Sequence, residues 1–93
     1  MSWSFSHRSK DKVKLQDACK ASFADSVKYC GATPEEGEKI TAPVLAILLA
    51  AIDAAIIPPS ASYLEVTTSG HADSGQRYFS VKVEPVYLPK TLD

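Results

Sequence analysis

Residue types that build nucleophilic active sites gather between positions 70 and 77. His71, Asp73 and Ser74 fall within four residues, and Arg77 follows them. A histidine can take a proton from a serine hydroxyl while a carboxylate orients the imidazole, but this chemistry needs a rigid scaffold. Asp, Ser and Gly are also the residues typical of turns. We therefore expect either an ordinary hairpin loop or a loop that contacts a ligand, with no catalytic residues.

A positive cluster near the N-terminus is a second candidate for binding an anion. Arg8, Lys10, Lys12 and Lys14 surround a single acidic residue, Asp11. Such residues either form a solvated helix start or bind the phosphate of a nucleotide. The candidate ligand-binding residues from this cluster and the loop are Arg8, Lys10, Lys12, His71, Ser74 and Arg77.

The spacing of cysteine and histidine argues against a disulfide and a metal site. Cys19 and Cys30 lie eleven residues apart in one predicted helix. This separates them by about 16 Å, well beyond disulfide range, so we expect two free thiols that serve as small core residues. His7 and His71 are distant in the sequence, so a zinc site lacks both the number and the pairing of ligands. We expect His7 at the edge of the core, and no metal or cofactor.

Length and composition indicate one ordinary globular domain over residues 1–93. The chain has 45% hydrophobic and 23% charged residues and a formal net charge of -1. This balance gives no global attraction to nucleic acid or to an anionic membrane surface. The N-terminus lacks a basic segment followed by an apolar run, so no secretory leader is expected and the cytoplasm is the predicted location.

The first half of the chain predicts a strand and helices. Residues 2–7 alternate between serine and larger side chains, which is the period of a strand with one buried face. A helix is expected from Lys10 or Asp11 to Cys30 and ends at Gly31. A capping motif at Thr33 starts a short helix, and Thr41 is expected to start a second one. One continuous kinked helix over residues 34–57 is the alternative.

Residues 42–57 form the only long apolar run, and Pro58 and Pro59 end it. The run is too short to span a membrane and contains Asp53, which is expected at the surface. A helix that is apolar nearly all round must be covered nearly all round. Either the rest of the fold or a second copy of the chain covers it, and we hypothesise a homo-oligomer. The candidate interface residues are Leu45, Leu48, Ile52, Ile56, Tyr87 and Leu88.

Residues 63–69 and 77–86 alternate as two strands of a hairpin. The tail from Pro85 onward is too apolar for a free segment and is expected to dock on its own domain or on a neighbour. The complete order is strand, helix, helix, strand, strand. It predicts an α+β two-layer sandwich, in which a three-stranded antiparallel sheet carries the helices on one face and leaves a hydroxyl-rich face open.

Two parts of the sequence resemble a known group of proteins. Met1-Ser-Trp-Ser-Phe-Ser6, together with Thr68-Ser-Gly-His71 and Phe79-Ser-Val-Lys-Val-Glu-Pro85, is similar to segments of small accessory proteins from tailed bacteriophages. The resemblance covers roughly a quarter of the chain. It implies a small accessory protein of the host cytoplasm rather than a metabolic enzyme, with no catalytic residues to carry over.

These observations lead to a hypothesis for the function. We expect a small non-enzymatic interaction module, homo-oligomeric, that binds a host protein or sequesters a small anionic signal such as a nucleotide. The alternative is a structural component of a virion or of its assembly. A membrane or nucleic-acid partner is not expected.

Overall fold

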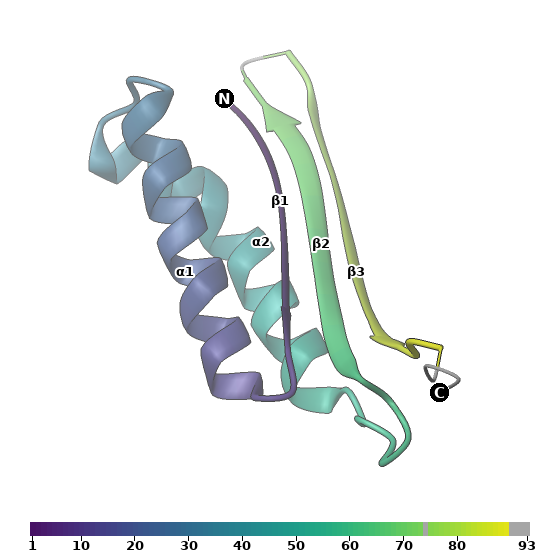
Figure 1. Cartoon of the computed structure of the whole chain (residues 1–93). Coiled ribbons are helices and arrows are strands. Elements are labelled where there is room, and N and C mark those ends of the chain that lie inside the picture. Colours follow the sequence, from purple (N-terminus) through teal and green to yellow (C-terminus); the bar gives the residue numbers. More distant parts are fainter. Residues whose placement is uncertain (74, 90–93) are drawn as a thin grey trace.

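The computed structural model describes residues 1–73 and 75–89. It confirms the predicted α+β class, with one sheet in the order β1-β2-β3 and both strand pairs antiparallel. Figure 1 shows the two helices packed on one side of this sheet. In chain order the elements are β1 (Ser2–Ser9), α1 (Lys12–Tyr29), α2 (Pro34–Ala54), β2 (Tyr63–Ala72) and β3 (Arg77–Val86).

Strand β1 has the predicted alternation. Trp3 is buried beneath the helices, whereas its neighbours Ser2 and Ser4 are exposed on the other face of the sheet. His7 lies at the edge of the core, as predicted, and its Nε2 is 2.7 Å from the Ser22 hydroxyl on α1. The His7 imidazole therefore has a hydrogen-bond partner within the fold.

Helix α1 begins and ends where the local sequence indicates. The Asp11 carboxylate accepts hydrogen bonds from the amides of Val13 and Lys14 at 2.9 and 3.3 Å, which satisfies two donors of the first turn. Gly31, with a φ of 71°, lies just beyond the C-cap residue Cys30. A left-handed φ is inexpensive only for glycine, so this residue ends the helix.

Helix α2 is one continuous helix, so the prediction of a short helix followed by a second start at Thr41 is wrong. Thr33 is the N-cap, as predicted, and its hydroxyl accepts from the Glu36 amide at 3.3 Å. Thr41 lies inside the helix, where its hydroxyl donates to the Gly37 carbonyl at 2.9 Å. A hydroxyl that bonds back four residues is compatible with a helix interior. Pro43 also lies within the helix.

The core lies between the helices and the sheet, with the buried strand residues on β1 and β2 and with Val81 and Val83 of β3 packed partly against it. Leu48 and Ile52 of α2 are fully buried in this core. Both were candidate interface residues, and the structure corrects this, because they pack within their own chain. Neither α1 nor α2 combines the length and hydropathy of a membrane-crossing helix, within the residues described. The other buried apolar residues of the cluster include Trp3, Leu15, Cys19, Phe23, Val44, Leu64 and Val66.

The two cysteines are free thiols, as predicted, but only one is in the core. Cys19 is buried, and burial raises the pKa of its thiol to about 11. Cys30 is exposed because it is the C-cap of α1, after the buried stripe has ended.

The two thiols should therefore react at very different rates. Because the thiolate is the reactive form, a disulfide reagent at pH 8 should modify Cys30 rapidly and Cys19 only when the protein unfolds. Absorbance of the released thiol measures this, with Cys30→Ser as the control that removes the fast phase. Equal rates for both thiols in the native protein would contradict the placement of Cys19.

Candidate functional site

A polar cluster occupies the hairpin end of the sheet, around His71. The pairing of β1 with β2 brings Ser2 opposite His71, and the Ser2 hydroxyl lies 2.6 Å from Nδ1. On the other side of the ring, Nε2 lies 2.8 Å from the Asp73 carboxylate. The Tyr78 ring stacks on the imidazole with 5.9 Å between the centroids. A hydroxyl, an imidazole and a carboxylate are thus hydrogen-bonded in series.

Ser2 is the member of this series that sequence reasoning missed. It lies 69 positions before His71, so no motif links the two residues. The signal that could have found it is the antiparallel pairing of the first strand with the hairpin, once the register is known.

The series connects β1, β2 and the hairpin turn through hydrogen bonds. Acyl transfer needs amide donors directed at the developing oxyanion. The amides of Gly75 and Gln76 at this turn both donate to Asp73 Oδ1 at 2.7 Å, so they are already used. Ser2 stands exposed on the face of the sheet that the helices do not cover. The geometry therefore supports a hairpin-stabilising role for the cluster.

The hydrogen bonds to Asp73 have a consequence for pH dependence. The bond from His71, and then those from the amides of Gly75 and Gln76, lower the pKa of this carboxyl from 3.8 to about 2. Because the folded value lies below the unfolded one, the stabilisation is present above pH 3.8 and is lost as the pH falls toward 2.

An NMR titration of the Asp73 carboxyl carbon should therefore give a midpoint near 2. His71→Ala should move this midpoint upward, because the bond from His71 is the largest cause of the shift. A midpoint that is the same in the wild type and in His71→Ala would contradict the hydrogen bond between these two side chains.

The basic residues lie at the other end of the sheet. Arg8 Nε donates to Glu65 at 2.8 Å, and its guanidinium lies 5.4 Å from the Tyr63 ring centroid. Lys12 donates to the carbonyl of Asp53 at 2.9 Å, which satisfies an acceptor at the C-terminal end of α2. Both cations therefore have structural partners. Asp53 lies at the surface, as predicted.

The two predicted halves of a phosphate site do not meet. Ser2 pairs with His71 at one end of β1, and Arg8 pairs with Glu65 at the other. Six residues of strand separate these positions by about 20 Å. Figure 1 shows the same separation, with the β2–β3 loop and the β1–α1 turn at opposite ends of the molecule. The sequence left open whether these two groups of residues meet, and within a single copy of the chain they do not.

Arg77 and His71 are attached to opposite faces of the hairpin. His71 pairs with Tyr78 on the open face, whereas Arg77 pairs with Ala72, which is buried on the helix side. Successive strand residues point to opposite faces of the sheet, so the two side chains start from opposite faces. Ser74 lies outside the described residues, and Lys10 is exposed beside α1. Within the described ranges, no group of three or more His, Cys, Asp and Glu residues could hold a metal ion.

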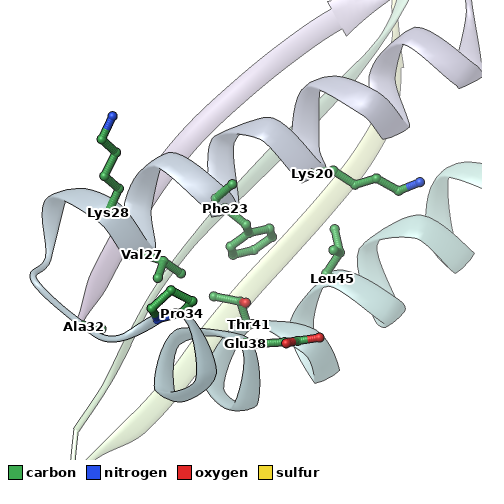
Figure 2. Close-up of a pocket in the computed structure, with 10 residues that line it drawn as sticks. Lys20, Phe23, Val27, Lys28, Ala32, Pro34, Glu38, Thr41 and Leu45 are labelled. Atoms are coloured by element: carbon green, nitrogen blue, oxygen red, sulfur yellow. The ribbon is translucent and has the colours of Figure 1, made fainter.

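A groove of about 550 Å³ lies between α1 and α2. The helices touch where a Cβ on Gly37 would lie 2.3 Å from Val27 Cγ1, and the groove opens beside this contact. Figure 2 shows Phe23 and Leu45 facing each other across the groove, with the Lys28 ammonium directed away from it. The volume suits a small molecule. The Thr41 hydroxyl in this lining already donates to Gly37, and the charged residues at the groove, among them Lys20 and Glu38, are of both signs, so the lining does not select a class of ligand.

Strand β3 is the least buried strand of the sheet, although α2 lies beside it and Val81 and Val83 pack partly against the core. On β2, Leu64 and Val66 are fully buried, but no residue of β3 is buried. Figure 1 shows β3 at one edge of the sheet, next to β2. We use the term β3 surface for the apolar side chains left partly or largely open along this strand and the tail, which are Tyr78, Phe79, Val81, Val83, Tyr87 and Leu88.

Of the predicted interface residues, three have side chains exposed to a partner and a fourth is half-exposed. Ile56, Tyr87 and Leu88 are exposed, whereas Leu45 is half-buried against the core. The tail residues Tyr87 and Leu88 remain 55% and 57% exposed, so the described part of the tail is not covered by its own domain. Phe79, which pairs with the buried Gly70 on the helix side of the sheet, is 45% exposed.

Comparisons of this chain with protein-family models, with curated proteins and with solved structures find no match. The geometry of its own surfaces is therefore the basis for assigning a function.

Proposed function

We propose that this chain is a small, non-enzymatic interaction module that associates with further copies of itself through the β3 surface. The observation that carries the proposal is the set of apolar side chains left open along an edge strand and the tail that follows it. Phe79 is 45% exposed, and the exposed tail residues Tyr87 and Leu88 continue the same surface beyond the strand. A contiguous apolar patch rimmed by polar residues is typical of a protein-binding site.

The unpaired backbone at the edge of β3 gives a second reason for association, besides the burial of apolar side chains. Its outer row of backbone groups is a ready template for another strand. Pairing with that strand would satisfy the backbone groups, while the apolar side chains gain neighbours. The predicted self-association interface on α2 is less favoured than β3, because Leu48 and Ile52 already lie inside the core of their own chain.

Light scattering over a dilution series tests the proposal. The wild type should show a mass above the 10.0 kDa of one chain, falling toward that value on dilution. Phe79→Ser should be a monomer over the same range, because it replaces a large, 45% exposed apolar side chain of the β3 surface with a small polar one.

Tyr29→Ser is the matched control. It removes an aromatic side chain that is 83% exposed at the end of α1, away from β3, and it should leave the mass unchanged. Circular dichroism shows whether each variant is folded. A wild type that is a monomer at every concentration, or a Phe79→Ser variant with an unchanged mass, would contradict the proposal.

The resemblance to phage accessory proteins gives the proposed setting, which is the cytoplasm of a bacterial host. There the module would bind a host protein and counter a host defence. A protein partner is favoured over a nucleotide, because the cationic groups proposed to hold phosphate lie at opposite ends of β1 or already have partners. Calorimetric titration with nucleotides should accordingly show no heat, and a saturable heat signal would revive the sequestering function.

A role as a virion or assembly component is the second candidate function. It is favoured by the open face of the sheet, where Ser4, Ser69 and Ser80 align across the three strands. The Ser69 and Ser80 hydroxyls lie 3.2 Å apart and are exposed, so they can hydrogen-bond to another subunit. Absence of the protein from purified particles would count against this candidate.

A further inference from the structure

The backbone groups that face the free edge of β3 can be identified from the hairpin. The Asp73 amide donates to the Gln76 carbonyl at 2.9 Å, and Ala72 pairs with Arg77. In an antiparallel pair, hydrogen-bonded residues alternate with residues whose backbone groups point outward. Even-numbered residues from Gln76 onward therefore bond to β2, and the odd-numbered residues face the free edge. The outward-facing residues of β3 are Arg77, Phe79, Val81, Val83 and Pro85.

Pro85 agrees with this assignment, because proline is tolerated in a sheet where its missing amide hydrogen faces away from the ladder. The Leu88 amide donates to the Ser62 hydroxyl at 3.2 Å, on the β2 side, so the alternation continues into the tail. The backbone of Tyr87 consequently continues the free edge.

We infer that two copies pair their β3 strands in antiparallel orientation, with a two-fold axis at Val83. This inference rests on the proposed self-association. In this register each residue before Val83 faces the residue equally far beyond it in the partner. Phe79 then faces the partner's Tyr87, and Tyr78 faces the partner's Leu88. These four residues include every exposed large hydrophobic residue of β3 and the described tail.

The charges of β3 fit the same register. Lys82 lies opposite the partner's Glu84, and the two-fold axis creates this pair twice. Within one chain the two side chains form a salt bridge of 3.3 Å, and both are exposed enough to interact with the opposite charge of the partner copy as well. Opposite charges that face each other on neighbouring strands stabilise their pairing. The result is one continuous six-stranded sheet with two helices from each copy on the same side.

The neighbouring symmetric register is less complementary. With Val81 on the axis, Lys82 would face the partner's Ser80, and Glu84 would face the partner's Tyr78. Tyr87 and Leu88 would then extend beyond the paired strands and stay exposed. The Val83 register is thus the one that satisfies both the charges and the apolar tail, although Pro85 withholds one hydrogen bond on each side of the axis.

Cysteine crosslinking tests the register directly. Val83→Cys, in a Cys30→Ser background, would place the two new thiols on the axis with Cα atoms about 5.5 Å apart, within disulfide range. Mild oxidation should convert this variant largely into a covalent dimer on a non-reducing gel.

Val81→Cys in the same background is the matched control. It is a half-buried valine on the same face of the same strand. Its copies would lie about 13 Å apart in the proposed register and should not crosslink. Light scattering of both variants before oxidation shows whether self-association is intact.

The possible outcomes test the proposed register and the proposed self-association separately. Crosslinking of Val83→Cys alone supports the inference, whereas crosslinking of Val81→Cys alone overturns the register and leaves self-association standing. A non-covalent dimer in which neither variant crosslinks overturns the strand pairing. A monomeric wild type overturns the proposed function itself.

Charge reversal gives a second readout that introduces no cysteine. Lys82→Glu should weaken association about tenfold, because it places like charges opposite each other twice. Adding Glu84→Lys should restore association. Equal association of the wild type, the single variant and the double variant would contradict the proposed charge pairing.

Discussion

Replacing Leu48 with alanine should lower the free energy of unfolding by about 3 kcal/mol or more. Leu48 is fully buried between α2 and the sheet, so the substitution removes apolar contacts and leaves a cavity that rigid neighbours cannot fill. Urea unfolding followed by circular dichroism measures the loss.

Ile47 is the matched control for Leu48. It is the preceding residue of the same helix and is 49% exposed, so Ile47→Ala should cost less than about 1 kcal/mol. Both variants are compared at one protein concentration, because self-association adds to apparent stability. If Leu48→Ala instead left stability unchanged and only dissociated the oligomer, Leu48 would belong to an interface and the packing described above would be wrong.

Gly70→Ala should also destabilise the fold, by about 2–3 kcal/mol. A Cβ at this position would lie 2.3 Å from Cζ2 of Trp3 on the neighbouring strand. The indole cannot move aside freely, because Trp3 is buried, donates to the Thr68 hydroxyl at 3.3 Å and packs against the Phe23 ring. Glycine is required at Gly70 by this close approach.

A double-mutant cycle tests the cause of that loss. In a Trp3→Phe background the smaller ring leaves room, so adding Gly70→Ala should cost at least about 1 kcal/mol less than in the wild type. Gly75→Ala serves as a control, because a Cβ there would make an ordinary 3.6 Å contact with the Asp73 carboxylate. Equal costs for Gly70→Ala in the two backgrounds would show that Trp3 is not the obstacle.

Local signals in the sequence predicted most of the strands and helices, because the residues that start, end or pattern such an element lie close together in the chain. The alternation around Trp3, the cap at Thr33 and the glycine after Cys30 each act within a few residues. The prediction failed at Thr41 and Pro43, where a motif typical of a helix start lies inside a longer helix. The tertiary packing of Val44, Leu48 and Ile52 holds that helix together despite the proline.

The position of the helices over the sheet could not be predicted from periodicity. A helix that is apolar on most of its surface does not specify which side contacts the sheet, so the sequence left open that Leu48 would be buried and Ile47 exposed. The side of the helix that contacts the sheet also determines which side chains of the β3 surface stay open. The Ser2–His71 contact likewise depends on strand register, which a single sequence specifies only through the complete fold.

The most direct test of self-association through β3 is residue-resolved amide hydrogen exchange of Phe79, Val81 and Val83. These amides face the free edge, whereas those of Ser80 and Lys82 are bonded to β2. If copies pair along β3, all five amides should be protected at high protein concentration, and only the edge amides should lose protection on dilution. If the amides of Phe79, Val81 and Val83 exchange rapidly at every concentration, the edge of β3 is unpaired and the central proposal is wrong.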